Sequence, residues 1–541
     1  MTEQIVDTAS PAAPGPRAER SGERGVARRL RALPVWVWPA GLMLLLTVWD
    51  IGRPQLWRDE NATWSGVSRP LPELLHLLGN VDASTGAYYL VLHAWTQVFG
   101  LSAVAMRLPS ALFMTVAAGA VACVGRRLFG DAAGLAGGLL FALMPTVSRY
   151  GQEARAYALV VMAAAVALLL LLRALERPGV ARWALYGVAA ALAGAAHLVA
   201  LTALLGHGAA VLLHARRHRS WRPVAAFAAT VACVAAALSP LLLLSHSQVG
   251  KQLYWVHHPD LARPWSTFGD LGEALVGSSV GALVLGLLVP AALCLARGRG
   301  PARGTAVAGA VLPVLAVVVV SEFGTSYFLA RYLLFTLPCW AVLAGAGLVA
   351  GARPAVRRLP ARFAPLGRGG KPLVALLTAG GLALTAATTL HDQRELRTYA
   401  SHEWISYPLR PLDRYFSYQG AAEAVVAHAR PGDGLVYVAY RGDMIDLGVD
   451  YYLGTHLKTL DQFFVSRTPQ RNGTYVPTYC ARPTACVASA PDRVWVVRQT
   501  SNYRPTAPFD AQVEALRQHY RVEQTYRLSR VEVQLLVRTT P

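Results

Sequence analysis

The sequence is poor in charged residues, and this scarcity limits the kind of protein it can encode. Only 15% of the 541 residues are Asp, Glu, Lys or Arg, whereas 54% are hydrophobic. A single soluble domain does not have this composition. Apolar stretches long enough to cross a bilayer recur from about Leu33 to about Leu390, and ordinary soluble sequence follows.

Lysine is almost missing, since Lys251, Lys371 and Lys458 are the only three in the chain. Arginine therefore supplies nearly all of the positive charge, and the net charge is +20. Nucleic-acid-binding proteins are also basic, but here the basic residues lie in short loops between apolar stretches, which is typical of polytopic membrane proteins. We therefore expect a lipid bilayer as the partner and no nucleic acid.

The sequence also lacks the glycine-rich motifs of nucleotide sites. It has no Walker A sequence and no strand-associated Gly-X-Gly-X-X-Gly, so nothing supports a cytoplasmic nucleotide-binding site. There are six cysteines, and the two in the polar C-terminal part, Cys480 and Cys486, can form a disulfide if that part is extracytoplasmic. The other four lie in apolar spans, where we expect packing roles: Cys123, Cys233, Cys294 and Cys339.

We expect three regions: a disordered cytoplasmic tail (residues 1–32), a transmembrane domain (33–390) and an extracytoplasmic α/β domain (391–541). The tail is not a cleavable signal peptide, because no Ala-X-Ala-type site follows the first apolar run. At His197, one long tilted helix could replace two short ones. With the split, about eleven spans are predicted, near Pro34–Ile51, Leu108–Val124, Ala132–Val147, Tyr157–Leu175, Trp183–Ala196, Leu198–His214, Val224–Leu244, Leu271–Leu295, Thr305–Val320, Tyr332–Ala350 and Pro372–Leu390.

The distribution of arginine and lysine predicts the orientation. The N-terminal tail and the loops on its side hold 24 of these residues, against 9 in the opposite loops. The positive-inside rule places the N-terminus in the cytoplasm, and an odd number of spans places residues 391–541 outside. In the first outer loop, Ala87–Phe99 is too short and too polar to span, and we expect an interfacial helix there.

Unusual charged residues gather in the predicted outer loops. Asp59 and Glu60 follow the first span; carboxylates kept beside hydrocarbon usually face a cavity, although a solvated acidic loop is the plain alternative. Asp82 opens the interfacial helix, where a helix N-cap would also explain it. Asp443, Asp446 and Asp450 in the outer domain are spaced as one solvated helix face.

Two arginines stand at the outer ends of predicted membrane helices. Arg331 is at the head of a helix, where the dipole disfavours a cation, so anion binding is one explanation and snorkelling to the interface is another. Arg155 lies beside Glu153, which could pair with it. Carboxylates, guanidinium groups and an approach from the bilayer suit transfer from a lipid phosphate: a base removes the proton of an acceptor hydroxyl, and a cation stabilises the departing phosphate.

Several motifs together resemble one group of proteins. They are Trp57-Arg58-Asp59-Glu60-Asn61-Ala62-Thr63, Tyr88-Tyr89-Leu90-Val91-Leu92-His93-Ala94-Trp95, Arg107-Leu108-Pro109-Ser110-Ala111-Leu112, Gly125-Arg126-Arg127-Leu128-Phe129-Gly130, Gln152-Glu153-Ala154-Arg155-Ala156-Tyr157-Ala158-Leu159, and Arg331-Tyr332 with Pro338. Over about residues 35–350 the chain resembles the GT-C membrane glycosyltransferases that use polyprenyl-phosphate sugars, in particular bacterial relatives of protein O-mannosyltransferases and aminoarabinose transferases. One departure is Thr85, where related chains often carry His.

This resemblance implies an α-helical polytopic membrane protein of the GT-C fold that transfers a sugar with inversion at the outer leaflet. The sugar it points to is mannose, and the implied partners are a polyprenyl-phosphate sugar donor and a cell-envelope glycan, lipid or protein acceptor. The need for a divalent cation, Mg or Mn, stays open. The implied catalytic residues are Asp59 as base with Glu60 and Asp82; the donor phosphate would contact Arg155 and Arg331, and the substrates would contact Glu153, Tyr157, Tyr88 and Tyr332.

Two other functions fit parts of the pattern. Many spans with charged residues also suit a polyprenyl-linked sugar flippase or transporter, but the charged residues cluster in outer loops and the sequence shows no inverted repeat. An enzymatically dead scaffold whose outer domain binds cell-wall material is the third alternative.

Overall fold

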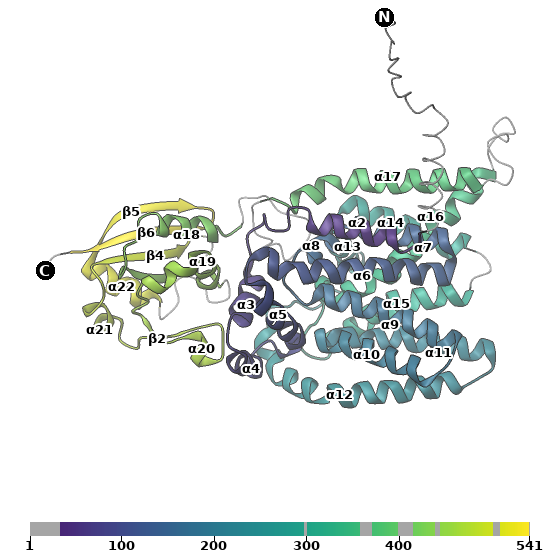
Figure 1. Cartoon of the computed structure of the whole chain (residues 1–541), viewed down its shortest axis with the longest axis horizontal. Coiled ribbons are helices and arrows are strands. Elements are labelled where there is room, and N and C mark those ends of the chain that lie inside the picture. The colour runs from purple at the N-terminus through teal and green to yellow at the C-terminus, as the bar shows by residue number, and fades with distance from the viewer. Residues whose placement is uncertain are drawn as a thin grey trace, which may run out of the picture.

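The protein consists of a helical bundle with a small sheet-containing domain at one end (Figure 1). The structure is a computed structural model that describes residues 33–296, 300–357, 371–398, 415–438, 444–500 and 509–539. The predicted tail (1–32) and Asp443 lie outside the described residues.

The helical part contains long helices and a group of shorter elements near the sheet domain. In chain order they are α2 (Val37–Val48), α3 (Arg58–Val67), α4 (Leu71–Asn80), η1 (Ala83–Thr85), α5 (Gly86–Phe99), α6 (Ala103–Phe129), α7 (Asp131–Leu143), α8 (Pro145–Gly151), α9 (Tyr157–Glu176), α10 (Val180–Ala196), η2 (Leu198–Thr202), α11 (Ala203–His218), α12 (Arg222–Gln252), α13 (Pro264–Val276), α14 (Ser279–Leu295), α15 (Gly300–Glu322), η3 (Ala330–Thr336), α16 (Leu337–Arg357) and α17 (Lys371–Glu395).

Within the described residues, seven helices are long and apolar enough to cross a membrane, or up to nine if each of two bent pairs is one span. The pairs α7–α8 and α13–α14 bend by 67° and 107°. Two further apolar helices, α2 and α10, are shorter than a full span. The predicted count of eleven is therefore not confirmed, although the chain does break at His197, between α10 and η2.

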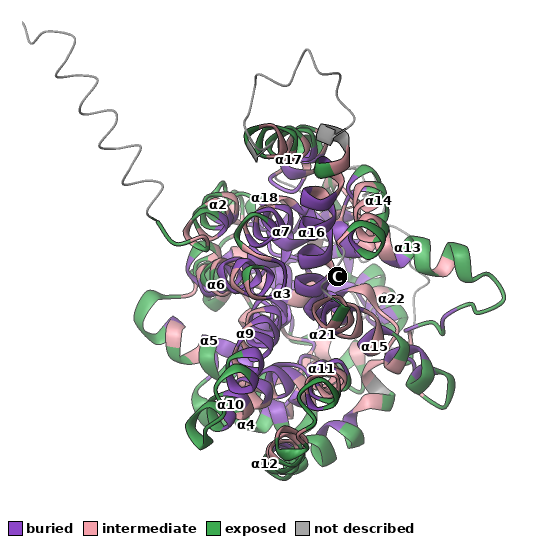
Figure 2. Ribbon diagram, turned by 90° about the vertical axis from the view of Figure 1, so that its right-hand side faces the viewer, coloured by how far each residue is buried: buried purple, intermediate pink, exposed green. Residues whose placement is uncertain are grey.

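The burial of the helices separates a packed centre from a rim. In the most apolar part of the span that ends in α16, 89% of residues are buried, whereas in α12 and α17 only 11% are. Figure 2 shows the same contrast from one end of the bundle, with exposed α12 and α17 at its edge. Because the exposed side chains of these rim helices are apolar, they suit contact with lipid.

The C-terminal domain is an α/β unit, as the sequence predicts. Its four-stranded sheet has the order β1-β4-β6-β5; β1 and β4 are parallel, and the other neighbours are antiparallel. A β2–β3 hairpin, α20 and α21 were not predicted. The elements are α18 (Tyr418–Val426), β1 (Gly434–Val438), α19 (Ile445–Leu453), η7 (Gly454–Thr459), β2 (Val465–Arg467), α20 (Pro469–Asn472), β3 (Thr478–Tyr479), α21 (Pro483–Ala488), β4 (Arg493–Gln499), α22 (Phe509–His519), β5 (Tyr520–Leu528) and β6 (Val531–Arg538).

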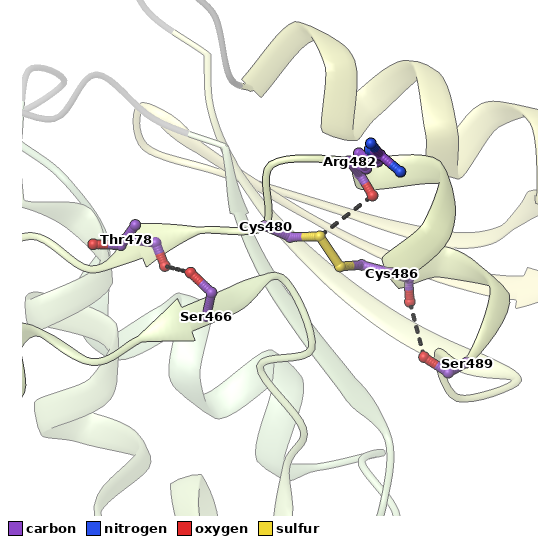
Figure 3. The surroundings of a disulfide bond; sticks show 6 residues. All are labelled: Ser466, Thr478, Cys480, Arg482, Cys486 and Ser489. Atoms are coloured by element: carbon purple, nitrogen blue, oxygen red, sulfur yellow. Dashed lines mark hydrogen bonds between the residues drawn. A yellow bond between two sulfur atoms is a disulfide. The ribbon is translucent and has the colours of Figure 1, made fainter.

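Cys480 and Cys486 form a disulfide in this domain (Figure 3). The bond ties the end of β3 to α21. It therefore joins two of the elements that the sequence pattern did not predict.

A buried ion pair joins α3 to the bundle. Arg107 on α6 donates from Nε and Nη2 to the two carboxylate oxygens of Glu60 on α3, at 2.8 and 2.7 Å. Its remaining N–H groups reach the carbonyl oxygens of Ile51, Pro54 and Gln55 at 2.8–3.1 Å. Both charged side chains are fully buried. Two of the motifs, one in the loop and one at the start of α6, therefore meet in a clamp that holds α3 in place.

Candidate active site

A cavity of about 760 Å³ lies where the bundle meets the C-terminal domain. Residues from α3, η1, α9, η2, α12, α15 and η3 line it, and the C-terminal domain adds two more. The lining residues with polar or aromatic side chains include Arg58, Asp59, Asp82, Ser84, Thr85, Arg155, Tyr157, His197, Thr202, Ser245, His246, Gln252, Tyr254, Trp255, Tyr327, Arg331, Tyr332 and Tyr475.

Asp59 lies in the first turn of α3 and is surrounded by arginines. Its carboxylate oxygens are 3.5 Å from Arg331 Nη1 and 3.5 Å from Arg58 Nε. Its backbone carbonyl oxygen is 3.4 Å from Arg155 Nη1. The structure thus brings together three predicted site residues, Asp59, Arg155 and Arg331, which are up to 272 positions apart in the sequence.

The surroundings keep Asp59 ionised. Burial opposes its charge, but the guanidinium groups of Arg331, Arg155 and Arg58 outweigh that effect and lower the pKa of its carboxyl below the usual value. The carboxylate is therefore already unprotonated, as a general base must be, although its base strength is reduced.

Arg155 and Arg331 both line the cavity, and each keeps one buried N–H group without a hydrogen-bond partner. Arg155 Nη1 contacts Thr63 Oγ1 at 3.2 Å and the Tyr89 hydroxyl at 3.1 Å, yet its Nε has no partner. Arg331 Nε is likewise buried without a partner. A buried guanidinium N–H without an acceptor is costly, which suits a site that completes itself with an anion.

The charges lining the cavity also favour an anion. Three guanidinium groups (Arg58, Arg155 and Arg331) face two carboxylates (Asp59 and Asp82). These five groups have a net charge of +1, which the single negative charge of a phosphodiester would neutralise.

The side chain of Asp82 does not act as a helix N-cap, which was the alternative explanation for this residue. It precedes η1 in the left-handed backbone region, with φ +58°, and its side chain caps nothing. Instead, its Oδ2 accepts hydrogen bonds from the hydroxyls of Tyr89 (3.0 Å) and Tyr475 (2.8 Å). Because Tyr89 also contacts Arg155, these bonds form a chain from the C-terminal domain to the arginine beside Asp59.

The other predicted site residues divide by their access to the cavity. Tyr157 and Tyr332 line it. Glu60, Glu153 and Tyr88 do not. Glu60 is held by Arg107 and also accepts from the backbone N–H of Ala154 at 2.9 Å.

Glu153 and Tyr88 are buried behind the lining. Glu153 pairs with Arg149 at 3.1 Å, not with Arg155. Burial raises the pKa of the Glu153 carboxyl to about 7. The Tyr88 hydroxyl is 3.2 Å from the Ser110 hydroxyl in the core.

Tyr475, His197 and Trp255 are among the lining residues that sequence reasoning did not find. Tyr475 is 386 positions from its partner Tyr89, and no local motif marks it. His197 lies at the predicted break between two apolar segments, with its ring 4.5 Å from that of Tyr332. Trp255 lies under the Arg331 guanidinium, whose carbon is 5.5 Å from the ring centre. For His197, a polar residue at an apolar break was the available signal.

The cavity does not offer an evident metal site. Among the residues that the structure describes, no group of three or more His, Cys, Asp or Glu side chains gathers to hold a metal ion. Thr85 lines the cavity.

Comparison with known proteins places this geometry in a familiar fold. Residues 86–243 match the family described as dolichyl-phosphate-mannose-protein mannosyltransferase, and no curated protein matches the chain. ArnT from Cupriavidus metallidurans bound to undecaprenyl phosphate aligns with a TM-score of 0.58 and 16% identity over 92% of this chain and 97% of that chain. Apo ArnT aligns with a TM-score of 0.56 and 16% identity over 96% and 98%. This chain is a multi-pass membrane protein with the fold of the GT-C superfamily of membrane glycosyltransferases.

Proposed function

We propose that the protein is a membrane glycosyltransferase that moves a sugar from a polyprenyl-phosphate donor to a cell-envelope acceptor hydroxyl. The observation that carries this proposal is the position of Asp59 beside Arg155 and Arg331 in the cavity. The family match over residues 86–243 and the fold shared with ArnT, which is described with bound undecaprenyl phosphate, support the donor class. The description of the matched family favours mannose as the sugar.

The donor phosphate would bind the guanidinium groups of Arg155 and Arg331, which line the cavity. Guanidinium groups remain charged at any working pH and match phosphate oxygens in geometry. The polyprenyl chain would leave the cavity along α12 and α15, which line one side of it and carry exposed apolar residues on their outer surfaces. Tyr157 and Tyr332, which line the same cavity, would contact the substrates.

The transfer would be a single displacement with inversion. The acceptor oxygen forms a bond to the anomeric carbon of the sugar while its proton passes to the Asp59 carboxylate. The bond between that carbon and the phosphate oxygen breaks, and the electron pair leaves with the polyprenyl phosphate. Arg155 and Arg331 stabilise the charge that develops on this leaving group.

The remaining predicted site residues would hold other residues of the site in place. Asp82 would hold Tyr89 and Tyr475, and thereby Arg155. Glu60 would fix α3, and hence Asp59, through its pair with Arg107. Glu153 would fix Arg149 behind the cavity.

The decisive experiment supplies radiolabelled polyprenyl-phosphate mannose to membranes that contain the protein. Transfer of label to cell-envelope material is expected, and Asp59→Asn should reduce it by about 10²–10⁴-fold. Asp50→Asn is the matched control, because Asp50 is an exposed carboxylate outside the cavity lining. If Asp59→Asn keeps more than about a tenth of the activity, Asp59 is not the base. Movement of label across the membrane without transfer would instead indicate a flippase.

A further inference from the structure

A second, smaller cavity of about 250 Å³ lies between α3 and the C-terminal domain. The end of α3 contributes Trp64, Ser65 and Ser68 to its lining. The C-terminal domain contributes carboxylates, amides, a phenol and further aromatic rings, among them Tyr437, Asp446, Asp450, Gln462, Phe464, Tyr479 and Gln512. None of these residues belongs to the proposed transfer machinery.

The unpaired side-chain amide of Gln512 on α22 indicates a ligand site. Its side chain is fully buried, and neither Nε2 nor Oε1 has a hydrogen-bond partner. Buried amides are normally paired, because leaving one unpaired costs about 1–3 kcal/mol. An amide kept in this way at the edge of a cavity is poised to bond something that enters it.

Two carboxyl groups share the same cavity. Asp450 accepts a hydrogen bond of 2.5 Å from the Tyr437 hydroxyl. Burial raises the pKa of Asp446 to about 6 and that of Asp450 to about 7. The predicted solvated face of this helix is therefore half-buried where it carries these two residues.

The chemistry of the lining selects a class of ligand. Partly protonated carboxyls, a phenol and an amide offer alternating hydrogen-bond donors and acceptors, which match vicinal hydroxyl groups. Trp64, Phe464 and Tyr479 supply aromatic surface. The volume lies just below the roughly 300–1,000 Å³ of drug-sized ligand sites, which suits one sugar ring and excludes a lipid chain or a folded peptide.

The two cavities are connected by α3. Asp59 is at its start and Ser68 directly follows its end, which at 1.5 Å per residue places them about 14 Å apart. α19 packs against α3, with Trp64 edge-on to Tyr451 at 5.5 Å. Met444, directly before α19, lines the first cavity, and Asp446 and Asp450 line the second.

We propose that the second cavity is a carbohydrate-binding site that holds a sugar unit of the acceptor at a distance from the point of transfer. The claim that the bound sugar belongs to the acceptor rests on the proposed function, whereas the claim that this cavity binds a sugar does not. It gives the C-terminal domain a direct part in acceptor recognition.

The test is equilibrium binding without donor. Methyl α-mannoside, methyl α-glucoside and methyl α-arabinofuranoside are titrated onto the full-length protein in detergent. Binding is followed by intrinsic tryptophan fluorescence, to which Trp64 in the cavity contributes, and by saturation-transfer NMR. At least one should bind saturably. Gln512→Leu should weaken that binding at least tenfold without loss of stability, because an apolar side chain replaces an amide that has no partner.

Gln518→Leu on the exposed side of α22 is the matched control and should bind as the wild type does. Asp446→Asn is a second probe that retains shape and should also weaken binding. Asp59→Asn should still bind the sugar although it transfers none, so failure of the proposed function would not imitate failure of this site. Saturable binding of none of the three sugars, binding that Gln512→Leu leaves unchanged, or competition by Mg²⁺ or Ca²⁺ in place of sugars would overturn the proposal.

Discussion

Replacing Glu60 by Gln tests whether this fully buried carboxylate on α3 supports the structure or takes part in the chemistry. The substitution keeps the shape of the side chain and can keep the bond from the Ala154 N–H, but it leaves the Arg107 guanidinium without an opposite charge. Removing one partner of a buried ion pair typically costs about 3–5 kcal/mol. Both side chains here are fully buried and separated by 2.7 Å, so the upper part of that range is expected.

The measurement is the free energy of unfolding in mixed micelles, followed by tryptophan fluorescence, together with transfer activity per folded molecule. Asp131→Asn is the matched control, because the Arg126–Asp131 pair has a similar separation of 2.8 Å but side chains that are 54% and 73% exposed. Such a pair contributes about 0–1 kcal/mol. The contrast between the two variants isolates the effect of burial.

A stable but inactive Glu60→Gln protein would refute the supporting role and assign Glu60 to the chemistry. A stable and fully active one would refute the clamp itself. The double substitution Glu60→Leu with Arg107→Met should recover only part of the stability. It removes both charges, but the carbonyl oxygens of Ile51, Pro54 and Gln55 lose their donor.

Four further outcomes are expected. Arg331→Lys should keep part of the donor affinity and Arg331→Ala should lose most of it, as measured from transfer against donor concentration; donor affinity that both variants leave unchanged from the wild type would mean that Arg331 only anchors its helix. Because the pKa of Asp59 is lowered, kcat/KM should stay level from pH 8 to 5; a fall below pH 7 would point to Glu153, whose pKa is raised to about 7. Tyr475→Phe removes the 2.8 Å bond to Asp82 and should lower kcat about tenfold with folding intact, whereas unchanged kcat would exclude Tyr475 from the site. A reporter active only in the cytoplasm, fused after Pro541, should be silent, and a signal would mean that one span was miscounted.

The sequence predicted local structure well where periodicity was strong. In the C-terminal domain the predicted α/β organisation corresponds to a four-stranded sheet with helices that include α18, α19 and α22. The hairpin of β2 and β3 was missed because each strand has only two or three residues, too few for alternation to appear. The span count was limited by bent helices, since hydropathy does not report a break at Met144 or Gly277.

At the site, the sequence identified the unusual charged residues but did not distinguish the roles that they play. Charged residues beside apolar segments identified Asp59, Arg155 and Arg331, which the structure brings to one cavity. The same signal selected Glu60 and Glu153, because a carboxylate that faces a cavity and one that neutralises a buried arginine look alike in sequence. Only the position of Arg107 and Arg149 distinguishes them. Tyr475 could not be predicted, because its contribution depends on how two separately folded parts dock.

The lowered pKa of Asp59 has a consequence for the proposed transfer. The neighbouring guanidinium groups make this carboxylate a weak base, although catalysis favours a base whose pKa is near the working pH. A donor phosphate bound to Arg155 and Arg331 would partly neutralise their positive charge and thereby raise the pKa of Asp59. The base would then become stronger only when the sugar donor is in place. Since kcat/KM reports the free enzyme and kcat the enzyme with substrate bound, the acid limb of kcat should lie at higher pH than that of kcat/KM. Coinciding limbs would show that the phosphate does not bind these two arginines.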